Sequence, residues 1–136
     1  MKKPKIFIQD CGSYTNEILV ICGATKKETY SFMKKKKIKH SCAKWVLEDF
    51  DHWQEKLKTD SGALFAWNSQ ICAMAMILNK PKNDWRFFEN LLHECHHAVW
   101  QITKQKAIQE EPENQAYLFD FLFRNIRRKI DGLDSI

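Results

Sequence analysis

The chain has 136 residues and a formal net charge of +5; 44% of its residues are hydrophobic, 29% are charged, four are glycine and three are proline. This composition excludes a disordered polar chain and a collagen-like or other low-complexity polymer. The length fits one domain, residues 1–136, because a single hydrophobic core usually spans roughly 100 to 200 residues.

Two short strands are expected near the beginning of the chain. Residues 5–9 and 17–22 are runs rich in β-branched and aromatic side chains, with Gly12 between them and Gly23 after the second. Short runs of this kind, bounded by glycine, are typical of neighbouring strands in a small sheet.

Two helices are expected next. Thr25 and Glu28 form the reciprocal capping pattern of a helix N-terminus, which predicts a lysine-rich helix over residues 25–37. Apolar side chains recur at helical spacing over residues 41–58, with acids and lysines between them. This spacing predicts a second, amphipathic helix.

An uncharged segment follows, from Ser61 to Asn79, and it approaches the length of a membrane-spanning helix. Asn68, Ser69 and Gln70 lie at its centre, where lipid would penalise polar groups most. We therefore expect residues 63–78 to form a strand pair around a turn, or one long bent strand, and no membrane association. Met74 and Met76 alternate as strand residues do and are expected in the core.

The second half is expected to be helical. Asn83 or Asp84 is a suitable cap for a helix over residues 85–104, and Pro112 suits the first position of a helix over residues 112–130. Glu111 is the expected cap of this last helix. Three tryptophans are expected to pack where helices meet: Trp45, Trp53 and Trp85.

The strongest chemical signal lies in the third expected helix, where His93, Glu94 and His97 match the pattern H-E-x-x-H. With five histidines and nine glutamates in the chain, chance would produce only about 0.01 such matches. Histidines four residues apart lie one helical turn apart, so both imidazoles can bind one metal ion. The sequence therefore predicts a zinc ion, Zn²⁺, on this helix.

A helical projection separates this pair from the apolar side of the same helix. At about 100° per residue, His93 and His97 fall on the side opposite the apolar residues. The apolar side consists of Leu91, Leu92, Cys95, Ala98, Val99 and Ile102. We therefore expect the apolar side to contact the core, Cys95 to point inward rather than to the metal, and the histidines to face a cleft.

A catalytic zinc site usually has three protein ligands and one exchangeable water. No histidine follows His97 in the chain, so another residue type has to supply the third ligand. Glu113, sixteen residues after His97, is the preferred candidate. Glu110, Glu111 and Asp120 are the alternatives, and Asp120 suits better the role of a hydrogen-bond acceptor that orients a ligand histidine.

The H-E-x-x-H helix followed by Glu113-x-x-Ala116 resembles the gluzincin type of zinc metallopeptidase, most of all short ImmA/IrrE-like proteins and phage-encoded zincins. The resemblance covers about a third of the chain. It implies an α+β, minimal zincin-like fold, in which a small twisted, mostly antiparallel sheet packs on the active-site helix and on a C-terminal helix that carries the glutamate. It also implies that His93, His97 and Glu113 bind the metal and that Glu94 is the catalytic base.

The expected activity is therefore zinc-dependent hydrolysis of a peptide or protein substrate, with Glu94 taking a proton from the zinc-bound water. The substrate is expected along an edge strand, with a side-chain pocket beside Trp67 or Trp100. Tyr117, His96 and His52 are the candidates for stabilising the oxyanion.

The charge and cysteine patterns favour a cytoplasmic location and no nucleic-acid partner. Five widely spaced cysteines without a C-x-x-C pair fit reduced thiols, and the apolar run behind the basic start is too short for a signal peptide. Much of the positive charge lies in one cluster: Lys26, Lys27, Lys34, Lys35, Lys36, Lys37 and Lys39. No nucleic-acid-binding motif accompanies this cluster, so we expect a solvated face there.

Two alternatives to a peptidase remain open from the sequence. One is a catalytically idle protein in which zinc only ties two helices together, serving as a scaffold or adaptor; Glu94 argues against it, because structural zinc needs no base. The other is a basic protein that binds nucleic acid through the lysine cluster.

Overall fold

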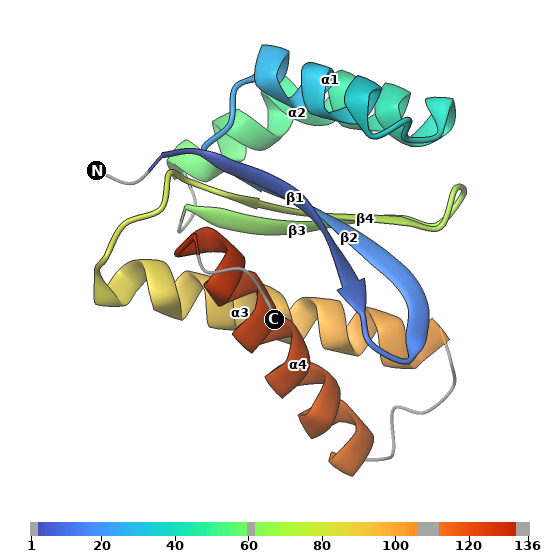
Figure 1. The fold of residues 1–136 in the computed structure, drawn as a ribbon, viewed down its shortest axis with the longest axis vertical. Helices are drawn as coiled ribbons and strands as arrows, with labels where there is room; N and C mark the ends of the chain where they lie inside the picture. The colour runs from blue at the N-terminus through green and yellow to red at the C-terminus, as the bar shows by residue number, and fades with distance from the viewer. Residues whose placement is uncertain (1–2, 60–61, 106–111, 133–136) are drawn as a thin grey trace.

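The structure is a computed structural model that describes residues 3–59, 62–105 and 112–132. It is an α+β fold in which one four-stranded sheet lies between two pairs of helices (Figure 1). The α+β class expected from the sequence is therefore confirmed, whereas the zincin-like packing implied by the resemblance stays a prediction.

The sheet is mixed, with the strand order β1-β2-β4-β3. Its strands are β1 (Lys5–Cys11), β2 (Tyr14–Cys22), β3 (Ala63–Asn68) and β4 (Ala73–Leu78). β1 pairs with β2, and β3 with β4, in antiparallel fashion, whereas β2 and β4 are parallel. The segment from residue 63 to residue 78 is thus a strand pair and not one bent strand, and it places β3 at an edge of the sheet.

One face of the sheet is covered by α1 (Lys26–Lys35) and α2 (His40–Thr59) (Figure 1). The capping pattern at the start of α1 is confirmed. The Glu28 amide donates to the Thr25 hydroxyl at 3.1 Å, and the Thr25 amide donates to the Glu28 carboxylate at 2.8 Å. The opposite face of the sheet is covered by α3 (Trp85–Gln105) and α4 (Pro112–Ile130).

The alternation of side chains along the strands produces two cores. On β4, Met74 and Met76 point toward α3 and α4, and Ala75 and Ile77 point toward α1 and α2. Both methionines are buried, as expected from the sequence. A strand buried on both faces reads as a nearly continuous apolar run, which explains why this segment resembled a spanning helix in sequence. No helix in the described part of the chain is long and apolar enough to cross a membrane.

Two of the three tryptophans pack inside the protein. The rings of Trp45 and Trp53, both on α2, meet edge to face at 5.3 Å between centroids; Trp53 belongs to the core on the side of α1 and α2, and Trp45 packs against that core. The prediction for Trp85 was wrong, because its side chain is 75% exposed. Trp85 opens α3, where the first turn projects beyond the sheet, so no neighbouring element covers it.

The third and fourth helices pack on opposite edges of the sheet and also on each other. α3 packs against the edge strand β3, and α4 packs against β1 at the other edge. α3 and α4 also pack against each other, and Figure 1 shows that they cross at an angle, with the N-terminal end of α4 lying away from α3.

Gly23 follows β2 and packs tightly against Lys80, which follows β4, the parallel neighbour of β2. Gly23 has φ +75°, and a Cβ at this position would lie 2.6 Å from Cα of Lys80. Gly12 has a similar φ of +65°, but its nearest neighbours are ring atoms of Phe121 at 3.8 Å. Both positions therefore disfavour a side chain through backbone conformation, and only Gly23 adds a backbone clash.

We expect Gly12→Ala to lower the free energy of unfolding by about 1 kcal/mol, the cost of the left-handed conformation. Gly23→Ala should lower it clearly further, because the backbone at Lys80 has to move. Urea denaturation of both variants measures the difference. Equal losses would show that the contact between Gly23 and Lys80 is not tight.

Candidate metal centre

The helix that carries the H-E-x-x-H motif is fixed by its apolar side. Asp84 caps α3 by accepting a hydrogen bond from the Phe87 amide at 2.8 Å. Leu91, Cys95 and Ala98, on the following turns, are fully buried against the sheet. Burial raises the pKa of the Cys95 thiol to about 12, which disfavours the thiolate form that binds metals. The inward orientation expected for Cys95 is confirmed.

The opposite side of α3 brings the two histidines of the motif together. His93 and His97 are exposed, and their Nε2 atoms lie 3.1 Å apart. Their rings are 4.7 Å apart between centroids and nearly perpendicular, at 79°. Glu94 completes a group in which one ligand atom of each residue lies within 4.8 Å of the others. The three residues that the motif singled out are therefore neighbours in space.

The spacing of the two nitrogens suits a shared tetrahedral ion. Zn–N bonds of about 2.0–2.1 Å place two nitrogen ligands about 3.3 Å apart, close to the 3.1 Å between Nε2 of His93 and Nε2 of His97. Partial desolvation of the ring, followed by the neighbouring His93 and His96, lowers the pKa of His97. A lowered pKa keeps the imidazole neutral at physiological pH, which is the form that binds metals.

Glu94 differs from the two histidines in being buried, with 3% of its surface exposed. Burial raises the pKa of its carboxyl group, and the adjacent His93 opposes this shift. Among the ion pairs between described residues, none involves Glu94. A buried carboxylate without a cationic partner is costly, so a divalent ion beside His93 and His97 would stabilise it.

A cavity of about 820 Å³ lies between α3 and α4 and contains both histidines in its wall. Its other residues are mostly apolar. They are His96, Val99 and Trp100 from α3 and Pro112, Gln115, Ala116, Phe119 and Asp120 from α4. A cavity with an apolar wall and a few convergent polar groups is typical of a ligand site.

The structure separates the candidates for the third ligand. Glu113 is exposed in the first turn of α4 and does not line the cavity, and its carboxylate does not belong to the group formed by His93, Glu94 and His97. Asp120 lines the cavity beside the two histidines. Glu110 and Glu111 lie outside the described residues, as does the capping role expected for Glu111. Glu113 as a zinc ligand stays a prediction.

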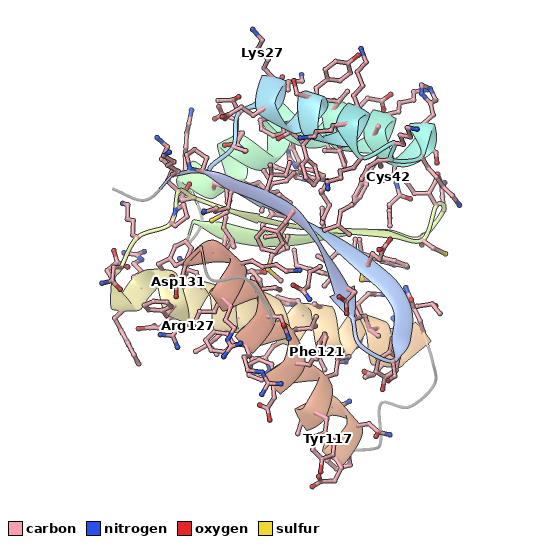
Figure 2. The ribbon with its side chains drawn as sticks, viewed as in Figure 1. Lys27, Cys42, Tyr117, Phe121, Arg127 and Asp131 are labelled. Atoms are coloured by element: carbon pink, nitrogen blue, oxygen red, sulfur yellow. The ribbon has the colours of Figure 1, made fainter. Side chains whose placement is uncertain are left out.

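The oxyanion candidates fall in three different places. His96 lines the cavity, and its ring stacks on Phe119 at 4.4 Å between centroids. Tyr117 is 69% exposed and points away from the body of the molecule (Figure 2); it lines a different cavity, beside the turn between β1 and β2. His52 was a wrong candidate, because it lies on α2 on the opposite face of the sheet.

The proposed side-chain pocket beside Trp100 coincides with the cavity, whereas Trp67 does not line it. Phe119 and Ala116 form part of the wall. Ala116 had entered the prediction only as the last residue of the E-x-x-A pattern, and no motif included Phe119. They recur at spacings of three and four residues after Pro112, so a projection of α4 places them on one side. The sequence could not show that this side of α4 faces α3, because no local pattern records how two helices pair.

The lysine cluster lies far from this cavity, on α1 and the loop that follows it. Lys27 projects on the opposite side of the molecule from Tyr117 (Figure 2). Lys26 forms an ion pair with Asp51 at 3.3 Å, and both partners are substantially exposed. The cluster therefore contributes no ligand to the metal centre.

Comparison with known proteins adds no assignment. The chain matches no protein-family model, no curated protein and no solved structure.

His96 provides a matched control for the metal-binding role of His97, because the two histidines are adjacent and exposed but face different neighbours. His97 pairs with His93, whereas His96 stacks on Phe119. We expect His97→Ala to weaken zinc binding by at least about 100-fold, because it removes a direct ligand. His96→Ala should change zinc affinity less than about tenfold.

Titration with zinc in the presence of a competing chromophoric chelator measures both affinities. Equal losses in the two variants would mean that the 3.1 Å approach of His93 and His97 does not define the site.

Proposed function

We propose that the protein is a zinc-dependent metallopeptidase that hydrolyses peptide bonds in the cavity between α3 and α4. The proposal rests on one observation: His93, Glu94 and His97 offer ligand atoms within 4.8 Å of one another. Two imidazole nitrogens are ligands that zinc accepts, and the carboxylate of Glu94 lies beside them. This donor set, the buried carboxylate and the adjoining cavity together support the assignment.

The zinc ion, when bound, supplies a polarised water and an electrophile for the carbonyl group of the substrate. His93 and His97 hold the ion through Nε2. Their place on a helix with a fully buried opposite side keeps the two nitrogens in position. Preorganised ligands of this kind avoid reorganisation during the reaction.

Glu94 is suited to act as the general base. Its pKa is raised by burial, which makes its carboxylate a stronger proton acceptor than an exposed glutamate. It accepts a proton from the attacking water at a carboxylate oxygen and donates it to the amine that leaves.

The substrate would extend from the cavity toward the edge strand β3. β3 pairs with β4 on one side and packs on α3, the helix that carries the metal ligands. An extended peptide can add to such an edge through main-chain hydrogen bonds. Trp100 and Phe119 then provide an apolar surface for one side chain of the substrate.

The same substitution at two glutamates of α3 tests the role of Glu94. We expect Glu94→Gln to reduce hydrolysis of a quenched fluorescent peptide library by a factor of about 10² to 10⁴, because a general base contributes about this much. Bound zinc should remain near one ion per chain. Glu89→Gln, at an exposed position of the same helix, should retain the activity.

Two other outcomes of this experiment would contradict the proposal. Activity that persists in Glu94→Gln would exclude Glu94 as the base. A wild-type protein that binds zinc and cleaves no peptide in the library would support the idle zinc-binding scaffold instead.

A further inference from the structure

We infer that Asp120 on α4, and not Glu113, supplies the third protein ligand of the metal centre. The inference rests on the proposed zinc site and specifies the residue that completes it. It follows from the way in which α3 and α4 pair, and it departs from the ligand that the E-x-x-A pattern implies.

Two contacts define the register between the two helices. The guanidinium carbon of Arg127 lies 5.0 Å from the ring centroid of Phe88. Eight residues further along α3, His96 stacks at 4.4 Å on Phe119, which lies eight residues earlier on α4. An equal step forward on one helix and backward on the other means that the two helices run in opposite directions, with one register near these contacts.

Counted in these equal steps, Asp120 lies at the level of Cys95 along the helix axes, between the levels of His93 and His97; Cys95 itself faces the core. Glu113 falls at the level of Ile102 instead. Asp120 and Glu113 are seven residues apart, which corresponds to about 10 Å along the helix axis at 1.5 Å per residue. A glutamate side chain is too short to bridge this distance in addition to the gap between the helices.

The cavity and the crossing of the helices agree with this register. Pro112, Ala116 and Phe119 line the cavity together with Val99 and Trp100, as the same pairing requires. Asp120 lines it as well, whereas Glu113 does not. Figure 1 shows the N-terminal end of α4, where Glu113 lies, separating from α3, which moves this glutamate still further from the histidines.

Asp120 would bind the ion through its carboxylate. In the structure this carboxylate lies outside the group of His93, Glu94 and His97, whose ligand atoms lie within 4.8 Å of one another, so its side chain would have to move toward them. The side chain is exposed at the cavity wall, so the change is open to it. A carboxylate oxygen about 2.0–2.2 Å from zinc would then complete a set of two histidines and one aspartate, leaving one position for water.

The test compares amide substitutions at the two candidate carboxylates, Asp120→Asn and Glu113→Gln, with Glu48→Gln on α2 as the control for loss of a negative charge. Affinity for Zn²⁺ is measured by chelator competition, and the absorption spectrum of bound Co²⁺ reports the ligand set. We expect Asp120→Asn to weaken Zn²⁺ binding at least about tenfold and to change the Co²⁺ spectrum. Glu113→Gln and Glu48→Gln should leave both unchanged. Asp120→His should restore binding, because a histidine can also ligate zinc.

The remaining outcomes overturn the inference in different ways. Loss of affinity in Glu113→Gln alone would assign the ligand to Glu113, and unchanged affinity in both variants would place it elsewhere. A weaker affinity of Asp120→Asn with an unchanged Co²⁺ spectrum would mean that Asp120 orients a histidine instead of binding the ion. In each of these cases the wild-type protein still binds zinc, so the proposed function survives; a wild-type protein without affinity for zinc would overturn both.

Discussion

The approach of two imidazole nitrogens to 3.1 Å on α3 is the interaction on which the account of this protein depends. His93 and His97 are one turn apart, and the opposite side of the helix is fixed by Leu91, Cys95 and Ala98 in the core. The core therefore sets the rotation of the helix about its axis, and this rotation directs both imidazoles into the cavity. The ligand pair is positioned by packing and not by contacts between the ligands alone.

The sequence was sufficient to predict the features that depend on local spacing. The cap at Thr25, the strand pair at residues 63–78 and the two sides of α3 all follow from neighbours a few residues apart. It was not sufficient where the outcome depends on how elements pair. The parallel pairing of β2 with β4, the exposure of Trp85 and the register of α4 on α3 involve residues far apart in the chain, and no local pattern records them. For this reason the sequence pattern favoured Glu113, although the structure places this residue outside the cavity.

The sheet separates two sides of the molecule with different chemistry. α1 and α2 cover one face and carry the lysine cluster, and α3 and α4 cover the other and enclose the cavity. Glu94 belongs to the second side but is buried, so its environment is set by the apolar core as much as by the histidines. That position explains how a single residue of the motif can have a raised pKa while its two neighbours in the group remain accessible to a metal ion.

Elemental analysis of the untagged protein, purified without added metal and without chelators, tests the central claim most directly. The account predicts close to one zinc ion per chain in the wild-type protein, and almost none after both His93 and His97 are replaced by alanine. A wild-type protein that contains no transition metal and takes up none on dialysis against zinc would contradict it. The nitrogen pair would then be a direct contact between two surface histidines.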